Sequence, residues 1–355
     1  MQVFQYVTDY SKKDGIGSDI SGFHSVLTSN NISSKIFCLH SHVTNKIVFS
    51  LKHLREFRFY NSDIHIIHYG GYGLPLHEIL NLPGKKVLRF HNITPSRFFD
   101  VNKNVHISAQ FALSEVKAYL ELRKFREFFS AFLFPSNYNY YSFQYNVGEI
   151  NRKKSLIIPI VRRYNQEEIF EYKKLSYRLG FVGRFAPNKK IEDILRLLYF
   201  LKKRSSEYSL HLLGTKPPVF SSYYNYLNSF AKSLSLQKSL HIKLNVSEES
   251  LDENLKNFDV YVSMSEHEGF GIPILEAFSR RIPTFAFANA AIPEIMRNAG
   301  VLFYAKDFNY LAELIHTINL QEVLKKRIIT TQDKVIDHYN SIDFDGSILK
   351  LLNFL

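Results

Sequence analysis

The amino-acid sequence predicts an α/β protein of two domains, each built on a parallel β-sheet with helices on both faces. Its 355 residues exceed what one ordinary core holds and suit two domains of roughly 170 residues each. Hydrophobic residues make up 45% and charged residues 22%, a globular composition rather than that of a disordered chain. Short apolar runs alternate with amphipathic stretches, and this alternation is typical of parallel sheets.

Apolar runs in the first half are predicted to be strands of a doubly wound sheet. They cover residues 3–7, 34–38, 64–68, 86–90 and 131–134. We assign residues 1–170 to this N-terminal domain. The boundary is placed near 170 because residues 158–174 mix a proline, adjacent arginines and acidic residues without periodicity, which is typical of an interdomain connection.

The second half repeats the alternation more regularly. Strands are predicted at 177–182, 210–213, 241–244, 259–264 and 284–287, and helices at 191–203, 223–234, 248–256, 273–280 and from 293 onward. Residues 171–340 form the predicted C-terminal domain. Residues 341–355 carry an apolar stripe at helical spacing, so we expect a terminal helix that packs on the N-terminal domain.

Cysteine content and the N-terminal residues bear on the compartment. Cys38 is the single cysteine, which excludes an intrachain disulfide and a cysteine-rich metal site and predicts a small buried side chain. The first residues read as a strand rather than a signal peptide, and no apolar run approaches about 18 residues. We therefore expect a cytoplasmic location.

Basic charge is concentrated in the first half. The net charge is +12, and residues 1–173 hold 22 Lys and Arg against 14 Asp and Glu. Such a field attracts nucleic acid, anionic lipid or phosphorylated substrates. The sequence contains no nucleic-acid recognition module, so we expect no nucleic-acid partner. Residues 117–134 combine basic and aromatic side chains and predict a helix that rests either on anionic lipid at the inner membrane face or on the protein core.

Two cations follow the first strand of the C-terminal domain. The segment 183–189 places Arg184 and Lys189 in the loop before the next helix. A guanidinium and an ammonium together can neutralise a pyrophosphate without a metal ion. The alternative for this segment alone is a solvated basic turn.

A second polar segment follows the strand at 259–264. It carries Glu268 in the loop and Glu276 in the next helix, a spacing that suits an elongated ligand. Glycines in this loop permit close backbone approach, and the start of the following helix offers N–H groups to an anion. The predicted ligand contacts of this loop are Gly269, Phe270, Gly271 and Ile272. Because open parallel sheets bind ligands beyond the carboxyl ends of their strands, both segments are candidate sites.

Metal binding is not expected. His65 and His68 would face opposite sides of one strand, and His40 with His42 offers only two ligands. The Asp343-Phe344-Asp345 segment has the spacing of a metal-nucleotide site, but it lies between predicted helices and we interpret it as incidental. No cofactor is expected.

With these residues in place, the sequence resembles the retaining glycosyltransferases of family 4, which have the GT-B fold. Glu268 and Glu276 match the Glu-x7-Glu pattern of that family, the Gly183, Arg184 and Lys189 set matches its earlier basic motif, and Pro293-Glu294 resembles its later helix start. The resemblance implies two Rossmann-like domains that face a cleft.

The resemblance extends into the first half. The segment 14–19, with Gly15 and Gly17, resembles the family's glycine-rich loop, and His91 follows a strand as the histidine near the transferred sugar does. The sequence departs from the family where glycine is frequent: these positions hold Lys190, Arg281 and the pair Ala290-Ala291. The departures put turn geometry there in question.

The resemblance implies a role for each site residue. Arg184 and Lys189 would hold the donor diphosphate, Glu268 the sugar hydroxyls and Glu276 the ribose. His91 with the Gly15 and Gly17 loop would lie at the reacting centre. Arg184, Lys189, Glu268 and His91 are the expected catalytic residues, and Gly183 and the Gly269–Ile272 loop complete the donor site.

The implied activity is transfer of a hexose from a nucleotide diphosphate sugar to a lipid-linked or growing bacterial surface glycan, such as O-antigen, capsule or lipopolysaccharide. GDP-mannose is the first expected donor and a UDP-hexose the second. Peripheral contact with anionic lipid of the inner membrane would accompany a lipid-linked acceptor. The alternatives are a nucleotide-sugar-binding scaffold without turnover and another GT-B activity such as a phosphorylase.

Overall fold

A computed structural model of the chain describes residues 1–11, 14–41, 46–102, 105–165 and 176–355. Their contacts divide the chain into two compact units. Unit 1 comprises Met1–Ser96, Ala109–Arg162 and Ile342–Leu355, and unit 2 comprises Arg97–Ser108 and Arg163–Ser341. The boundary expected near 170 lies outside the described residues. The segment Arg97–Ser108, which the sequence assigned to the first domain, groups with unit 2.

Unit 1 is a parallel sheet in the order β3-β2-β1-β4-β5-β6-β7. Its strands are β1 (Val3–Tyr10), β2 (Ser34–Ser41), β3 (Val48–Ser50), β4 (Ile64–Tyr69), β5 (Lys85–Phe90), β6 (Ala131–Phe134) and β7 (Ser155–Ile157). Its helices are α1 (Gly15–Ser29), α2 (Leu76–Leu80), α3 (Val105–Phe125), α4 (Asn137–Val147) and α12 (Phe344–Phe354), with 3-10 turns η1 (Leu51–Glu56), η3 (Arg126–Phe128) and η4 (Arg152–Lys154).

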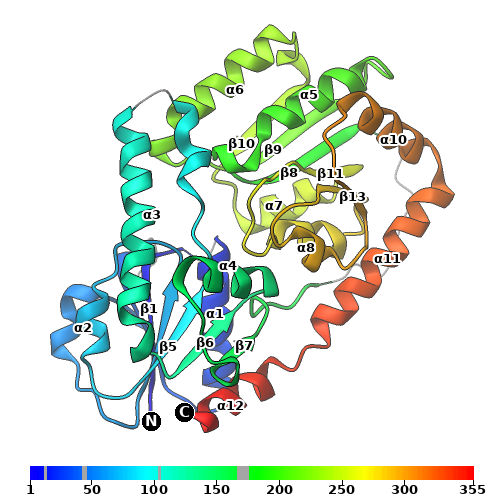
Figure 1. The fold of residues 1–355 in the computed structure, drawn as a ribbon. Coiled ribbons are helices and arrows are strands. Elements are labelled where there is room, and N and C mark those ends of the chain that lie inside the picture. The colour runs from blue at the N-terminus through cyan, green and yellow to red at the C-terminus, as the bar shows by residue number, and fades with distance from the viewer. Residues whose placement is uncertain (12–13, 42–45, 103–104, 166–175) are drawn as a thin grey trace. The chain divides into compact units, whose positions relative to one another are not determined.

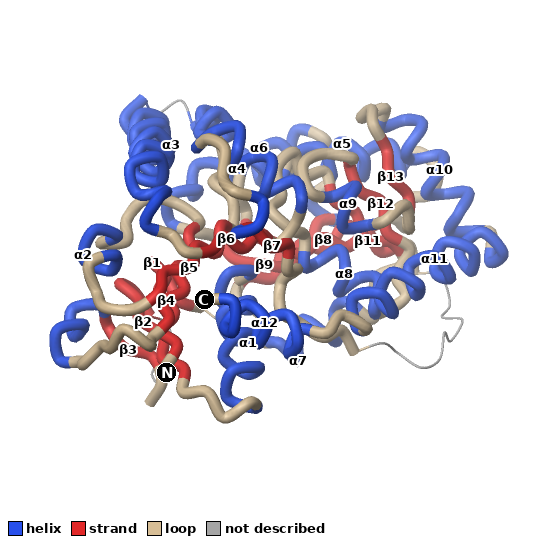
Figure 2. Tube along the Cα trace, turned by 60° about the horizontal axis from the view of Figure 1, so that its bottom comes forward, coloured by secondary structure: helices blue, strands red, loops and turns tan. Residues whose placement is uncertain are grey.

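Two apolar clusters cover the two faces of the unit 1 sheet. Helices α2, α3 and α4 pack on one face, where Phe4, Ile67 and Phe90 lie, and α1 and α12 pack on the other, where Val3, Ile66 and Val87 lie (Figure 2). Strand alternation explains this division because successive side chains point to opposite faces. The terminal helix therefore completes the core of unit 1, and Asp343 caps it by accepting from Gly346 N at 2.8 Å.

Unit 2 is a second parallel sheet, in the order β10-β9-β8-β11-β12-β13. Its strands are β8 (Arg178–Arg184), β9 (Ser209–Thr215), β10 (Leu240–Leu244), β11 (Val260–Ser263), β12 (Thr284–Phe287) and β13 (Val301–Phe303). Its helices are α5 (Ile191–Lys202), α6 (Ser221–Ser233), α7 (Glu248–Leu255), α8 (Ile272–Ser279), α9 (Ile292–Met296), α10 (Phe308–Leu320) and α11 (Glu322–Asn340), with 3-10 turns η5 (Pro187–Lys189), η6 (Pro218–Phe220) and η7 (Gln237–Ser239). The turn η2 (Ser96–Asn102) begins in unit 1 and continues into unit 2.

Helices lie on both faces of the unit 2 sheet (Figure 1). Helix α5 packs with α6 and α10, and α8 packs with α11. Both units are thus doubly wound, Rossmann-like layers, as the strand–helix alternation predicts.

The helix predicted at 117–134 is wrong beyond Phe125, where α3 ends. Residues 131–134 form the buried strand β6, which confirms the strand predicted at the same residues. The fully apolar run at 131–134 pairs with β5 on one side and β7 on the other, and this sheet pairing prevails over a continued helix. No helix within the described ranges is both long and apolar enough to cross a lipid bilayer.

Candidate functional site

The polar residues of unit 2 gather where its strand order reverses. Strands β8 and β11 are neighbours, yet the chain leaves β8 toward β9 and reaches β11 only after β10. Ligands of open α/β sheets bind beyond the carboxyl ends of the strands at such a switch point. Arg184 is the last residue of β8, and the loop 265–271 follows β11, so both predicted segments lie there.

Lys189 and Glu268 form an ion pair across this switch point. Lys189 ends the turn η5, and its Nζ lies 2.5 Å from Oε1 of Glu268. The two side chains are 14% and 17% exposed, so solvent still reaches the pair. An ammonium has three donors, and Glu268 occupies one of them.

Asn188 fastens the turn η5 to the loop after β11. Its side-chain amide donates to His267 O at 3.0 Å, and its own carbonyl accepts from Glu266 N at 2.9 Å. Asn188 is 4% exposed, so these bonds are shielded from water. The sequence analysis did not single out Asn188, although it lies within the quoted segment 183–189.

Glu276 approaches the same point from helix α8. Its side chain is buried. Tyr261 lies on the preceding strand β11, and its hydroxyl donates to Val182 O at 3.4 Å, one residue before Gly183. Burial, and to a smaller extent the charges of Glu268 and Glu276, raises the pKa of this hydroxyl.

Arg184 differs from its neighbours because it is exposed. Within the described part of the chain, no acidic group pairs with its guanidinium. Gly183 precedes it, and a side chain there would begin 3.0 Å from the Phe181 ring. The guanidinium at the end of β8 is therefore exposed, and among the described residues it has no acidic partner that would compete with a ligand.

A network of charged side chains, which the sequence analysis did not predict, contacts the loop 265–271 through Glu266. Glu266 lies 2.7 Å from Lys306 Nζ and 3.6 Å from Lys190 Nζ, and Lys306 also donates to Asp193 at 2.8 Å. These residues lie on separate elements, so no local spacing signals them. Burial, with Lys189 and Arg97 opposing protonation, lowers the pKa of His267 to about 4, so its ring is neutral at pH 7.

The start of helix α8 requires a glycine. Gly271 precedes the helix with φ 102°, a conformation that side chains rarely adopt. Phe270 and Ile272 on either side are buried, which fixes the loop to the core, while Gly269 is only partly buried. The first N–H groups of α8 consequently begin beside the ion pair.

Unit 1 has its own switch point, between β1 and β4. Helix α1 starts there at Gly15, and Asp14 caps it by accepting from Gly17 N at 2.7 Å. A side chain on Gly17 would begin 1.8 Å from Ser11 O, so the turn itself requires this glycine. A side chain on Gly70, after β4, would begin 2.7 Å from Ile16 and 3.9 Å from His91, which places the glycine-rich turn beside His91.

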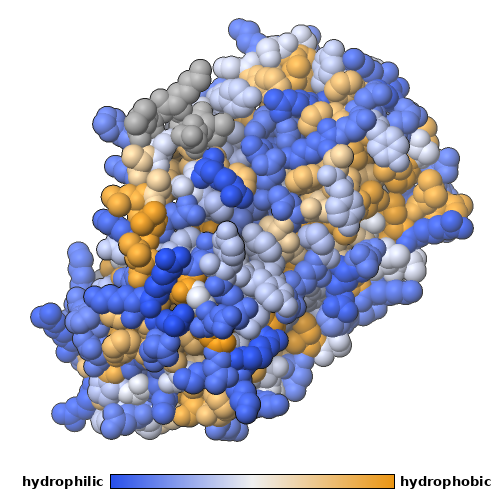
Figure 3. Space-filling model, viewed as in Figure 1, coloured by the Kyte–Doolittle hydropathy of each residue, from blue (hydrophilic) through white to orange (hydrophobic). Residues whose placement is uncertain are grey.

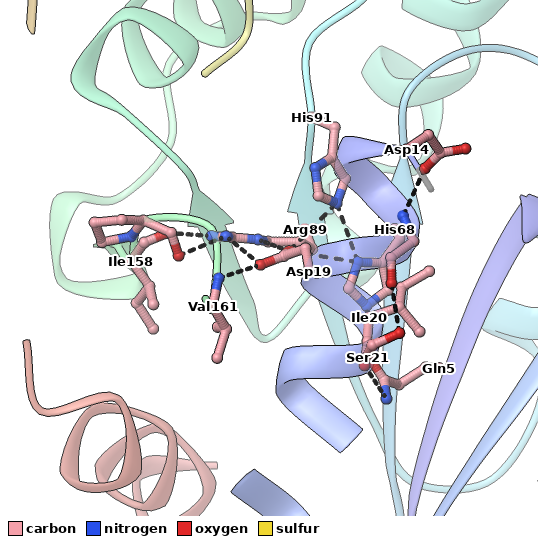
Figure 4. Close-up of polar contacts among 12 residues, drawn as sticks. Gln5, Asp14, Asp19, Ile20, Ser21, His68, Arg89, His91, Ile158 and Val161 are labelled. Atoms are coloured by element: carbon pink, nitrogen blue, oxygen red, sulfur yellow. Dashed lines mark hydrogen bonds and ion pairs between the residues drawn. The ribbon is translucent and has the colours of Figure 1, made fainter. Parts of the chain in front are cut away.

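Below this turn lies a buried ion pair between Asp19 of α1 and Arg89 of β5 (Figure 4). Arg89 donates to both Asp19 oxygens, at 2.8 and 3.1 Å, and to the carbonyls of Ile158 and Pro159, at 2.6 and 3.1 Å. Asp19 also accepts from Val161 N at 2.9 Å. Both side chains are 0% exposed.

Two histidines adjoin this ion pair. His68 Nδ1 lies 3.0 Å from His91 Nε2, and Asp19 Oδ2 lies 3.6 Å from the same His91 nitrogen. The ligand atoms of these three residues lie within 4.8 Å of one another, as in a metal site. Arg89, however, already compensates the one carboxylate, and the histidine nitrogens face each other, so the geometry favours a hydrogen-bonded cluster. The sequence analysis named His91 but not Gln5, His68, Asp19 or Arg89 as site residues.

Comparisons with known proteins agree with this architecture. The family model described as "Glycosyl transferases group 1" matches residues 164–335, a little under half of the chain. The matched residues cover most of the second segment of unit 2. A curated relative, "GDP-mannose:cellobiosyl-diphosphopolyprenol alpha-mannosyltransferase" of Xanthomonas oryzae pv. oryzae, is 29% identical over 99 residues, which are 28% of this chain and 25% of the relative.

Solved structures resemble both units. The pneumococcal O-GlcNAc transferase GtfA, in complex with UDP and GlcNAc, has a TM-score of 0.72 at 10% identity and covers 99% of this chain and 98% of its own. TarM of S. aureus has a TM-score of 0.65 at 16% identity, and the match covers 85% of this chain and 57% of TarM. The chain thus spans about a quarter of the mannosyltransferase relative and a little over half of TarM. The likeness assigns the fold, which is GT-B with two Rossmann-like domains.

Proposed function

We propose that this protein is a retaining glycosyltransferase that uses a nucleotide diphosphate sugar. One observation carries the proposal: Lys189 and Glu268 form an ion pair at the switch point of a sheet whose residues match a glycosyltransferase model. Arg184 ends the strand β8 before this point, and Glu276 lies on the helix α8 after it. Such a site offers cations to a diphosphate and carboxylates to hydroxyls.

The chemistry follows from where charge develops. As the glycosidic bond to the diphosphate breaks, negative charge grows on the leaving phosphate, and cations aimed at that charge lower the barrier. Arg184 and Lys189 would take this role, with the first N–H groups of α8 and the Gly269–Ile272 loop beside them. Glu268 would bind the sugar and Glu276 the ribose. The acceptor hydroxyl would attack the anomeric carbon from the face of the departing phosphate, and the leaving phosphate would take the hydroxyl proton.

GDP-mannose is the proposed donor, and a UDP-hexose is the second candidate. The mannosyltransferase relative supports GDP-mannose. A UDP-hexose is supported by GtfA, a protein of the same fold whose structure contains UDP. A thermal-shift series with GDP-mannose, UDP-glucose and UDP-GlcNAc tests the choice, because a ligand that binds only the folded protein raises its Tm. We expect the largest shift with GDP-mannose, and no shift with any of the three would contradict the proposal.

Turnover separates this proposal from its alternatives. Release of GDP from GDP-mannose with a lipid-linked or free glycan acceptor is the expected result. A donor that binds without hydrolysis or transfer to any acceptor would instead favour a scaffold, and a reaction that depends on inorganic phosphate would favour a phosphorylase. Because the paired cations already supply positive charge, we propose that the reaction needs no metal or cofactor and that EDTA leaves the rate unchanged.

A surface of unit 1 favours an acceptor that is linked to a membrane lipid. Helix α3 buries Ala118, Leu122 and Phe125 but exposes an apolar stripe, visible as the patch over α3 at the left edge of Figure 3. The stripe consists of Leu113, Val116 and Leu120, each more than half exposed, with exposed Lys117, Arg123 and Lys124 beside it. An apolar stripe flanked by basic residues suits the interface of an anionic bilayer.

Vesicle flotation tests this part of the proposal. We expect binding to vesicles that contain phosphatidylglycerol, weaker binding to neutral phosphatidylcholine vesicles and loss of binding at high salt. Leu113→Gln with Leu120→Gln should abolish binding, whereas Tyr304→Gln, at an exposed aromatic residue of unit 2, serves as the control. Equal binding of wild type and the α3 variant would refute the membrane contact while leaving the donor site untouched.

A further inference from the structure

A chain of hydrogen bonds in unit 1 links Gln5, His68 and His91. Gln5 lies on β1, His68 on β4 and His91 directly after β5, three strands that are neighbours in the sheet. Gln5 Oε1 lies 2.9 Å from His68 Nε2, and His68 Nδ1 lies 3.0 Å from His91 Nε2. Gln5 and His68 are fully buried, so water does not compete for these bonds.

The orientation of the Gln5 amide determines which nitrogen of His68 carries a proton in this series of hydrogen bonds. Gln5 Nε2 lies 3.3 Å from the carbonyl of Ile20 and 3.3 Å from Ser34 Oγ. The Ile20 carbonyl can only accept a hydrogen bond, so the amide nitrogen must face it and the amide oxygen must face His68. His68 Nε2 therefore donates and carries a proton.

The protonation state of each histidine ring follows from this donor. Burial lowers the pKa of both His68 and His91 well below the usual value. Arg89 acts in the same direction on both rings, and Asp19 opposes it at His68 without reversing the shift. Each ring therefore holds a single proton at pH 7. His68 Nδ1 is consequently a bare acceptor, and His91 Nε2 must donate to it. Asp19 Oδ2, 3.6 Å away, is a second acceptor for that proton. In Figure 4 the other nitrogen of His91 lies on the far side of the ring from these partners.

We propose that Gln5 and His68 are positioning residues that hold His91 in its Nε2–H tautomer, so that His91 Nδ1 is presented as a hydrogen-bond acceptor to a hydroxyl of the bound substrate. The substrate part of this inference rests on the proposed function, in which that hydroxyl belongs to the transferred sugar. The tautomer part concerns the protein alone. Arg89 supports the arrangement by fixing Asp19 through two hydrogen bonds.

Nitrogen-15 NMR of the full chain with labelled histidine tests the tautomer. Long-range proton–nitrogen spectra show which ring nitrogen carries the proton, and His68→Leu and His91→Leu assign the two signals. We expect both rings as Nε2–H in the wild type. In Gln5→Met the Nε2–H preference should be lost in both rings, because nothing then orients His68. A wild-type His91 that is protonated on Nδ1, or positively charged, would overturn the proposal.

Kinetics test whether the tautomer matters. His68→Asn keeps an acceptor oxygen near the position of Nδ1, whereas His68→Leu removes it. We expect His68→Leu to lose about tenfold in kcat/KM, the effect of one hydrogen bond, and His68→Asn to recover most of that loss. His65→Gln is the matched control, because His65 is equally buried on β4 but bonds to Tyr6 and Pro83 instead.

The outcomes separate the two proposals. Equal losses in His68→Asn, His68→Leu and His65→Gln would mean that His68 serves only packing, and would refute its positioning role. If the wild type shows the Nε2–H tautomer but transfers no sugar to any acceptor, the tautomer assignment stands and the proposed function fails. If transfer proceeds and the His68 variants are as active as wild type, the positioning role fails and the function stands.

Discussion

The two polar clusters of this protein differ in how deeply their charged side chains are buried and in how many hydrogen bonds these side chains make within the protein. In unit 1, the Asp19 and Arg89 side chains are 0% exposed, and the guanidinium donates to two carboxylate oxygens and two carbonyls. In unit 2, Lys189 and Glu268 are 14% and 17% exposed and meet through one contact. In the first cluster four of the five guanidinium N–H donors are bonded within the protein, whereas the groups of the second can exchange their partner for a ligand.

The difference indicates a division between support and binding. A buried, fully bonded ion pair costs much to disturb and fixes the elements that carry it, here α1, β5 and the segment at 158–161. A pair that water reaches is worth less to stability, and its groups can reorganise around a diphosphate. Stability and activity should therefore respond in opposite ways to changes in the two clusters.

The largest effect is expected from removing the buried cation. Arg89→Met leaves Asp19 buried without its partner, and we expect a loss of about 3–5 kcal/mol in the free energy of unfolding. Hydrogen exchange in peptides of unit 1, read by mass spectrometry, measures it. Arg184→Met, at the exposed arginine, should change stability by less than about 0.5 kcal/mol. Similar losses in both variants would erase the contrast between the clusters.

Activity should show the reverse order. Lys189→Ala and Glu268→Ala are each expected to lower kcat by about 100-fold or more, the usual effect of removing an electrostatic contact of the transition state, while the protein stays folded. Because the two side chains contact each other, the double variant should lose much less than the product of the single losses. Near-normal rates in either single variant would reject the proposed donor site.

Acid should weaken unit 1 through its buried histidines. Burial, with Lys86 nearby, lowers the pKa of His65 to about 4, while an unfolded histidine has a pKa of about 6.5. The unfolded chain therefore binds more protons, and stability falls as the pH drops below about 6.5. Between about pH 6.5 and 5.5, His65→Gln should lose about 1 kcal/mol less than wild type in urea unfolding. If the free energies of unfolding of wild type and His65→Gln changed with pH in parallel, His65 would take up its proton in the folded state, contrary to this prediction.

The smallest effect concerns a backbone position in unit 2. Ala290 has φ 54°, a left-handed conformation that costs a residue with a side chain about 1 kcal/mol relative to glycine. Ala290→Gly should therefore raise the free energy of unfolding by about 0.5–1 kcal/mol, as read from the urea midpoint. Ala288→Gly, two residues earlier, has no such strain to relieve and should not stabilise the protein.

The departures from the family's glycines illustrate what sequence reasoning can reach. Lys190, Arg281 and Ala290, each noted where glycine is frequent, have φ of 51°, 55° and 54°. The chain keeps the left-handed turn and tolerates the side chain, because Lys190 and Arg281 gain ion pairs with Glu266 and Asp333. The sequence indicated where the backbone would be unusual but could not show these compensating contacts.

Strand prediction succeeded in the sheet centres and at the edge strand β10, and it missed the other three edge strands. The central strands were expected within a few residues of their observed bounds, because strands buried on both faces are nearly continuous apolar runs. The missed strands β3, β7 and β13 are edge strands of three residues each, and most of their side chains are only partly buried. Nothing in such short, half-polar segments distinguishes them from loops.

The same reasoning explains which contacts the sequence could indicate. Lys189 and Glu268 follow strands within recognisable segments, and the structure pairs them. Asp19 and Arg89 are separated by 70 residues, and both occurred inside segments quoted for other residues. Their pairing depends on how α1 crosses the sheet, which no local pattern encodes.

Helix α12 has a consequence for the order in which the protein is made. Phe344, Ile348, Leu351 and Leu352 belong to the same apolar cluster as Val3 and Phe23, although the ribosome adds them after all of unit 2. Domains usually fold as they emerge, but one face of the first sheet is covered by α1 alone until this late segment is made. All of unit 2 is therefore synthesised before the core of unit 1 can be completed.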